Sequence, residues 1–336
     1  MRAWVLEQQS PIEERPLKLM EVPTPHLQGN EVRIKVFVCG ICRTDIHIAE
    51  GDLPLKKVPV IPGHEVVGVV DEVGEGVRRF RVGDRAGVYW LHGACGKCKY
   101  CLSQRENYCP DFRATGWHED GGYAEYVTVS EAYALSLNEV QLEPVEIAPL
   151  MCPGIAGFAA FKLTKVQEGD RFGLYGYGPT ASVALKVAQS LGIETYVSTR
   201  SQKNIKRARQ EGATWAADAS KEEMPYPLDA AILFPPAGYL VEPALSQLVR
   251  DGTLVMAPVS SSPIVIKNYS KNLWGRTIRT LYNVSRADAE EFFGMVDELG
   301  LQVGTSLFAF EQLQDALILA KHGKLDQPNA VIRVAD

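Results

Sequence analysis

The chain has 336 residues, of which 46% are hydrophobic and 23% charged, and its formal net charge is −6. This is the composition of an ordinary globular protein of about two domains, and its acidic balance argues against nucleic acid as a partner. No apolar stretch reaches the roughly 20 residues of a membrane span, and the first residues lack the apolar core of a signal peptide. We therefore expect a cytoplasmic protein with no membrane contact, whose seven cysteines suit a reducing compartment.

Roughly the first 150 residues predict short β-strands, because β-branched segments are interrupted there by glycine and proline. The clearest of these predicted strands span Val32–Val38, Val66–Val73 and Tyr123–Val129. This part of the chain is therefore expected to form a mostly-β domain.

Three residues spread along this first part have the chemistry of a catalytic zinc site. Cys42 lies in G-I-C-R-T-D-I-H, His64 precedes Glu65 in G-H-E-V-V-G, and Cys152 lies in A-P-L-M-C-P-G. Two thiolates and one imidazole form the three-ligand pattern that leaves a zinc coordination position open for substrate. Cys39 forms C-x2-C with Cys42, but we expect it to pack in the core.

Four further cysteines fall within fifteen residues, in C-G-K-C-K-Y-C-L-S-Q-R-E-N-Y-C. Cys95, Cys98, Cys101 and Cys109 can close a tetrahedral shell around one zinc ion, and a full shell leaves no place for substrate. An iron–sulfur cluster is the alternative, since three close cysteines would also serve it. We favour a structural zinc site because the remaining cysteines also suggest zinc.

From about residue 154 the pattern changes to strands that alternate with helices. We expect strands at Phe172–Tyr175, Glu194–Ser198, Leu228–Leu233 and Gly252–Ala257, and helices at Thr180–Leu191 and Asn204–Glu211. Such alternation predicts a parallel, doubly wound sheet. The last part of the chain predicts an amphipathic helix over Phe310–Gly323 and a strand over Ala330–Val334.

The turn after the first of these strands has the pattern of a dinucleotide site. Gly176, Gly178 and Ala181 stand as G-x-G-x-x-A between a predicted strand and a predicted helix. The glycines allow a tight turn and close approach of the backbone to a pyrophosphate, and the helix N-terminus attracts its charge. A glycine-rich turn without a ligand is the alternative.

The residues near the end of the second strand favour NADP(H) over NAD(H). NAD enzymes place an acidic residue about 20 positions after the first glycine to hold the ribose hydroxyls. The matching position here is Thr199, followed by Arg200, so there is no carboxylate to repel a 2′-phosphate. A guanidinium pairs well with phosphate, although NAD(H) binding with Arg200 stacked on adenine stays open.

The motifs together resemble those of one enzyme family. Gly63–Val77 matches the motif G-H-E-x2-G-x5-G-x2-V without a gap, and W-L-H-G-A-C (Trp90–Cys95) is similar to the yeast and bacterial branch. Over essentially its whole length the chain resembles the zinc-dependent, medium-chain alcohol dehydrogenases.

The resemblance implies an α/β fold in two domains. A mostly-β GroES-like catalytic domain is expected over residues 1–153, with a structural zinc lobe near 90–112, completed by residues 284–336. A Rossmann domain with a doubly wound parallel sheet is expected over 154–283. We also expect two zinc ions per chain, one catalytic and one structural, and a homodimer or homotetramer.

The resemblance also implies roles for residues around the catalytic zinc. Thr44 is at the position of the proton-relay hydroxyl, and His47 is at that of the base that passes the proton to solvent. Arg43 matches the residue that binds the cofactor pyrophosphate. Asp45 is expected to orient His64 through a hydrogen bond. Glu65 is either a carboxylate behind the ligands or a transient ligand.

The expected substrate is a primary alcohol or aldehyde larger than ethanol. The yeast-like branch has tryptophans where this chain has Ala49 and Leu53, so smaller side chains are expected to open room, with Trp90 as another wall. A polyol or sugar dehydrogenase of the same superfamily is an alternative, but it would need a polar pocket. A non-catalytic nucleotide-binding protein is a third reading, which predicts the loss of a zinc ligand.

Overall fold

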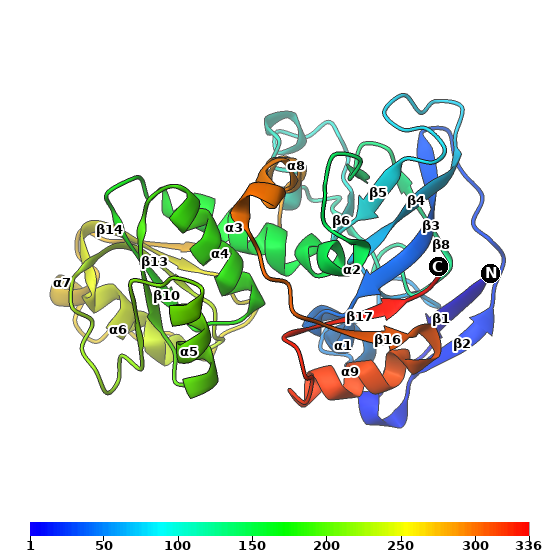
Figure 1. Ribbon diagram of the computed structural model, residues 1–336. Coiled ribbons are helices and arrows are strands. Elements are labelled where there is room, and N and C mark those ends of the chain that lie inside the picture. Colours follow the sequence, from blue (N-terminus) through cyan, green and yellow to red (C-terminus); the bar gives the residue numbers. More distant parts are fainter. Residues whose placement is uncertain (336) are drawn as a thin grey trace. The chain divides into compact units, whose positions relative to one another are not determined.

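The computed structural model describes residues 1–335 and divides into two compact units (Figure 1). The first unit comprises Met1–Cys152, Asn283–Asp297 and the chain from Gln302 onward. The second comprises Pro153–Tyr282 and the short stretch Glu298–Leu301. The first unit is therefore built from segments at both ends of the sequence.

The first unit is a mostly-β structure, as predicted. Its seven-stranded sheet has the order β16-β17-β3-β4-β5-β9, and β8 also pairs with β3. The strands are β3 (Glu31–Gly40), β4 (Val66–Val73), β5 (Arg85–Val88), β8 (Tyr126–Ser130), β9 (Leu135–Ser136), β16 (Thr305–Ala309) and β17 (Asn329–Arg333). A separate hairpin joins β1 (Arg2–Leu6) to β2 (Leu17–Glu21).

Alternation along β3 creates the core of this unit. Every second side chain from Val32 to Val38 is buried, which is the pattern of a strand with one face on the core. The C-terminal strand β17 pairs antiparallel with β3, and the helix before it, α9 (Leu313–Lys321), packs on the same core. Figure 1 shows these last elements beside the first strands. Cys39 is fully buried in this core, which confirms the expectation for it.

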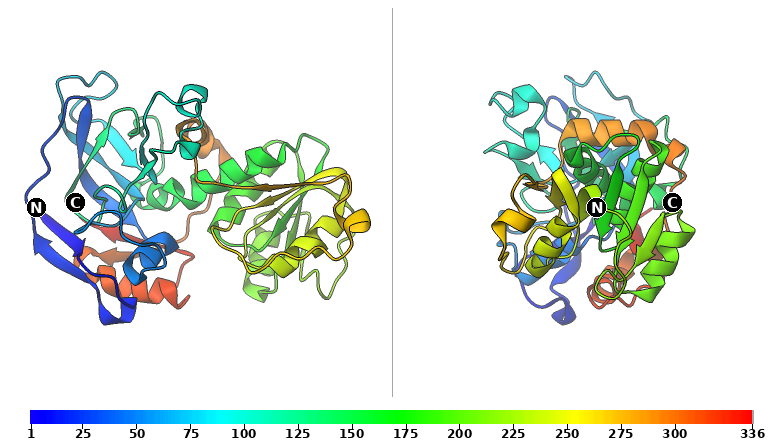
Figure 2. Two further views of the ribbon diagram at one scale, coloured as in Figure 1. Left: turned by 180° about the vertical axis from the view of Figure 1, so that it is seen from behind. Right: turned by 90° about the vertical axis from the view of Figure 1, so that its left-hand side faces the viewer.

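The second unit contains the predicted parallel sheet. Its six strands have the order β12-β11-β10-β13-β14-β15, and each neighbouring pair is parallel. They are β10 (Arg171–Tyr175), β11 (Glu194–Ser198), β12 (Trp215–Ala217), β13 (Leu228–Leu233), β14 (Leu248–Met256) and β15 (Thr277–Thr280). The helices are α3 (Pro153–Thr164), α4 (Pro179–Ser190), α5 (Gln202–Gln210), α6 (Val241–Ser246) and α7 (Tyr269–Asn272). Figure 2 shows helices on both faces of this sheet, as in a doubly wound fold.

Several short elements were not predicted from the sequence. In the first unit these include α1 (Arg43–Glu50), α2 (Pro144–Ile147), α8 (Arg286–Met295), β6 (Leu91–Gly93) and β7 (Arg113–Ala114). In the second unit the strands β12 and β15 and the helices α3, α6 and α7 were not predicted either. Most are too short to show a clear period, and α1 carries charged and polar side chains beside its buried isoleucines.

Within residues 1–335, no single helix is long and apolar enough to cross a membrane. Two consecutive helical segments, Pro144–Met151 and Pro153–Thr164, meet the length and composition criteria only when taken together. Most of their residues are buried inside the protein.

Candidate active site

The loop between β3 and α1 carries the first candidate ligand. Cys42 is the residue that caps the N-terminus of α1, and its backbone N–H donates to the Asp45 carboxylate over 2.9 Å. Position 40, at the end of β3, requires glycine, because a Cβ there would lie 2.0 Å from a carboxylate oxygen of Glu65. The end of β3 is thus shaped to let Glu65 approach Cys42.

The fold brings together the four candidate ligands of the first zinc site. The ligand atoms of Cys42, His64, Glu65 and Cys152 all lie within 4.8 Å of one another. The two sulfur atoms are 3.7 Å apart, close to the roughly 3.8 Å separation of two thiolates bound to one tetrahedral zinc at about 2.3 Å. The donor set and its spacing therefore fit a zinc ion, with Glu65 as a fourth potential ligand.

Asp45 is the centre of the hydrogen bonds behind these ligands. One of its carboxylate oxygens lies 3.0 Å from Nδ1 of His64, which confirms the expected contact. The other accepts from the Tyr123 hydroxyl over 2.8 Å and from the Cys42 amide. The imidazole is therefore held through Nδ1, so that Nε2 is the ring nitrogen left for a metal among the other candidate ligands.

Tyr123 has no place in the motifs, and sequence reasoning missed it. Its ring packs against Gly63, where a Cβ would lie 2.7 Å from the ring. The glycine of the G-H-E motif thus makes room for the tyrosine that holds Asp45. The one signal in the sequence is the glycine at position 63, because a glycine in a motif can mark a place where another side chain packs closely against the backbone.

The surroundings of the ligands shift their pKa values strongly. The hydrogen bond from the Cys152 thiol lowers the pKa of Cys42 well below its ordinary value, and the same bond raises that of Cys152. Burial works to lower the pKa of His64, but the charge and hydrogen bond of Asp45 outweigh it and raise the pKa. Burial raises the pKa of Glu65. The two thiols thus share a proton that a divalent cation can displace.

The predicted relay residues lie on α1. The Thr44 hydroxyl is 3.6 Å from the Cys42 sulfur, beside the ligands. His47 lies one helical turn further and its Nδ1 is 2.7 Å from the carboxylate of Asp52, a partner that the sequence did not indicate. Arg43 is exposed and donates to the backbone carbonyl of Lys321 at the end of α9.

One tryptophan lies beside the candidate ligands and stacks on a second. The Trp90 ring makes an edge contact with His64 at 5.0 Å between centroids and stacks on Trp117 at 6.0 Å. Each indole N–H is fixed, Trp90 to the Asn283 side chain and Trp117 to the Pro54 carbonyl. Trp117 was not singled out from the sequence, because nothing local links it to the zinc motif.

The expectation for Ala49 is wrong. Its side chain is fully buried in the core cluster of the sheet, so its small size fills a packing position and does not widen a site. Leu53 does lie in the small apolar cluster that contains Trp90 and Trp117.

The other four cysteines form a second compact set. Their sulfur atoms lie within 4.8 Å of one another, with Cys98 and Cys101 3.6 Å apart. This spacing fits one tetrahedral ion, whereas an iron–sulfur cluster would divide the four thiolates among two or four irons and so spread the sulfurs further apart. Hydrogen bonds from the backbone at Lys97 and Cys98 lower the pKa of Cys95 to about 6, which favours the thiolate that a metal binds.

The nucleotide turn has the shape that the motif predicts. Gly176 follows β10 with a φ of +83°, and a Cβ there would lie 2.9 Å from Pro235. The next glycine, Gly178, caps α4 and has open space where a side chain would be, which would let a pyrophosphate approach. Ala181 lies in the first turn of α4 and is buried. The donor-rich helix start therefore fits a dinucleotide phosphate.

Thr199 and Arg200 follow β11, the strand next to β10. Thr199 is largely buried and its backbone N–H donates to Ala217, whereas Arg200 is exposed. The exposed guanidinium stands at the carboxyl end of the parallel sheet, where nucleotides bind in this class of fold.

Comparison with known proteins supports these observations. Residues 28–139 match the family model described as "Alcohol dehydrogenase GroES-like domain". The chain is 43% identical over 323 residues to a probable alcohol dehydrogenase, AdhA, of Mycobacterium tuberculosis, which covers 94% of this chain and 93% of that protein. The chain belongs to the zinc-type medium-chain alcohol dehydrogenases.

Solved structures of alcohol dehydrogenases have the same fold. A cinnamyl alcohol dehydrogenase of Sorghum bicolor is similar with a TM-score of 0.86 and 27% identity, over 99% of this chain and 97% of that one. The CAD of Helicobacter pylori complexed with NADP(H) is similar with a TM-score of 0.84 and 26% identity, over 99% of both chains. This alcohol dehydrogenase is an oxidoreductase of alcohols or aldehydes, from a family that uses zinc and a nicotinamide cofactor.

Proposed function

We propose that this alcohol dehydrogenase binds two zinc ions per chain and uses NADP(H) in preference to NAD(H). Its substrate would be a primary alcohol or aldehyde larger than ethanol. The first unit would be the catalytic domain and the second the dinucleotide-binding domain. The observation that carries the proposal is the convergence of Cys42, His64 and Cys152, with Asp45 hydrogen-bonded behind the imidazole.

The catalytic zinc would be held by Cys42, His64 and Cys152, and the structural zinc by the four cysteines of the lobe. A bound zinc ion supplies Lewis-acid polarisation of an alcohol or carbonyl oxygen, and the nicotinamide supplies or accepts the hydride. The chain itself orients His64 through Asp45. It also holds the thiols of Cys42 and Cys152 next to each other, so that a bound cation can displace the proton between them. Glu65 is buried within reach of the same position and is suited to exchange with a ligand.

The Thr44 hydroxyl is proposed to take the proton of the substrate and pass it towards His47. It lies beside Cys42, and His47 is partly exposed, with Asp52 to hold its ring. Thr44→Ala should lower the rate of alcohol oxidation by about 10²–10⁴-fold, because general acid–base groups contribute that much. Thr44→Ser is the matched control and should recover most of the rate in steady-state assays. Near-full activity of Thr44→Ala would exclude the relay.

An aromatic or long apolar substrate is supported by the two stacked tryptophans beside His64. Their rings offer flat apolar faces, and both indole N–H groups already have partners. A polyol would find few free polar groups along this wall. A panel of benzyl, cinnamyl and straight-chain aldehydes, with acetaldehyde and sorbitol for comparison, would test this. A higher kcat/KM for acetaldehyde or sorbitol than for the larger aldehydes would contradict it.

The preference for NADP(H) is supported by the exposed Arg200 and by Thr199 at the position where NAD enzymes carry an acidic residue. We expect kcat/KM to be higher with NADPH than with NADH. Arg200→Ala should weaken NADPH by about 10–100-fold while leaving NADH nearly unaffected, since only NADPH carries the 2′-phosphate. Lys206→Ala, at an exposed lysine of α5, is the control and should affect neither. Equal losses for both nucleotides would show that Arg200 does not bind the phosphate.

Self-association through the second unit is supported by the edge of its sheet. The strand β15 is at the edge, and two large aromatic side chains are exposed just before it, Tyr269 at 63% and Trp274 at 60%. An unpaired edge next to apolar side chains favours pairing with a second copy. Sedimentation of a purely monomeric enzyme at micromolar concentration would exclude the expected dimer or tetramer.

A further inference from the structure

The nucleotide turn carries a large buried residue between its two glycines. Tyr177 is 3% exposed, although it lies at the tip of a turn. Its ring lies 5.0 Å from the guanidinium of Arg207 on α5. Its hydroxyl donates to the carboxylate of Glu211, at the end of the same helix. The Tyr177 side chain therefore connects the nucleotide turn to α5.

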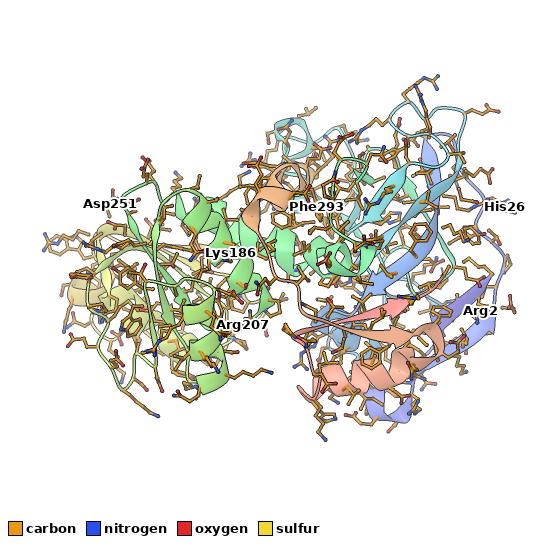
Figure 3. All side chains as sticks on the ribbon, viewed as in Figure 1. Arg2, His26, Lys186, Arg207, Asp251 and Phe293 are labelled. Atoms are coloured by element: carbon orange, nitrogen blue, oxygen red, sulfur yellow. The ribbon has the colours of Figure 1, made fainter. Side chains whose placement is uncertain are left out.

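Glu211 joins three elements of the second unit. Its carboxylate, with a side chain 12% exposed, also accepts from the Ser182 hydroxyl on α4 and pairs with Arg207 at 2.9 Å. Its backbone carbonyl accepts from Lys186 and Gln189 on α4, each at 3.1 Å. Figure 3 labels Lys186 and Arg207 on these two helices. The turn, α4 and α5 thus meet at one residue.

Arg207 reaches the turn directly as well. Its guanidinium donates to the backbone carbonyl of Gly178 over 3.3 Å. Gly178 caps α4, so this contact fixes the peptide group that precedes the free N–H groups of the helix. The same guanidinium pairs with the negative charge of Glu211. Without this pairing the carboxylate would repel a pyrophosphate bound at the nucleotide turn.

We propose that Glu211 and Arg207 are positioning residues that hold the nucleotide turn in its binding shape and thereby set the affinity for both NADPH and NADH. The proposal rests on the proposed dinucleotide-binding function of this unit. A glycine-rich turn loses conformational freedom when it closes on a phosphate, and bracing it beforehand reduces that loss. Because the braced part is the backbone around the pyrophosphate, the 2′-phosphate should make no difference.

The test is a titration of the full-length enzyme with NADPH and NADH, followed by nucleotide fluorescence, for Tyr177→Phe and Glu211→Gln. Tyr177→Phe keeps the ring over Arg207 and removes only the hydroxyl, while Glu211→Gln keeps the shape and removes the charge. Both should raise the Kd of both nucleotides by roughly three- to thirtyfold, because only part of the free energy of a hydrogen bond to a charged group is expected to be lost from binding. The kcat at saturating nucleotide should stay within about twofold, because the bound turn can still reach the same shape.

Glu194→Gln is a matched control in the same unit. Glu194 also accepts from a tyrosine, Tyr196 at 3.1 Å, and pairs with an arginine, Arg171 at 3.5 Å, but at the amino ends of β10 and β11. This variant should bind both nucleotides as the wild type does.

Unchanged Kd values in folded Tyr177→Phe and Glu211→Gln would overturn the proposal. A selective loss of NADPH would also overturn it, because the network would then be sensing the 2′-phosphate and not the turn. A wild-type enzyme that binds neither nucleotide would instead refute the proposed cofactor. The two failures are therefore distinguishable.

Discussion

Cys152→Ala is expected to abolish hydride transfer while the chain still folds and binds dinucleotide. The variant loses one of the three ligands that we assign to the catalytic zinc, and the remaining thiol and imidazole cannot hold the ion firmly. A Lewis acid contributes several kcal/mol of transition-state stabilisation, so the rate should fall by at least about 10³-fold. Steady-state assays and zinc analysis of the purified variant would measure both losses.

Cys39 provides the matched control for this experiment. It is another cysteine close to the ligands in sequence, but it is fully buried in the core and is not part of the ligand group. Cys39→Ala should therefore keep its zinc and its activity, with a modest loss of stability from the missing sulfur. Full activity and zinc content in Cys152→Ala would contradict the assignment of Cys152 as a ligand.

Cys98→Ser is expected to have the largest effect on stability. The four sulfurs of the lobe lie close enough for one ion, and the segment from Cys95 to Cys109 is made of short turns with little regular structure to hold it otherwise. Because the binding energy of a structural metal is also folding energy, the free energy of unfolding should fall by several kcal/mol. The zinc content should fall from two ions per chain to one, while turnover per folded molecule changes little.

Leu102→Ser is the control for the lobe. Its side chain lies in the same segment and is 75% exposed, so its replacement should leave metal content and unfolding midpoint unchanged. Two zinc ions retained in Cys98→Ser, or iron found in the wild-type enzyme, would overturn the assignment of a structural zinc. Chemical denaturation with metal analysis of the same samples separates these outcomes.

The parts of the fold that could be predicted are those with a strong local signal. The four central strands of the parallel sheet, β10, β11, β13 and β14, are short apolar runs, and the turn at Gly176 has a fixed pattern of glycines, so these were located from the sequence, whereas the edge strands β12 and β15 were not. The candidate ligands were found because thiols and imidazoles in such motifs are rare. The helix α1 escaped notice because it is eight residues long and begins directly after a candidate ligand.

What could not be predicted depends on contacts between distant residues. Tyr123 holds Asp45 from 78 positions away, and Trp117 stacks on Trp90 from another loop. The error over Ala49 has the same origin, because the sequence does not show which face of α1 turns towards the core. Periodicity is a property of neighbours along the chain, so it carries no information about such pairs.

The pairing of β17 with β3 has a consequence for the order in which the protein matures during synthesis. Residues 329–333 complete a sheet begun by residues 31–40, so the first unit lacks a strand until residue 333 has been synthesised. The second unit is nearly continuous in sequence and can fold while the ribosome is still working. A nascent chain would therefore carry a folded second unit while the sheet of the first unit still lacks a strand. A truncation that removes β17 should lower the stability of the first unit far more than that of the second.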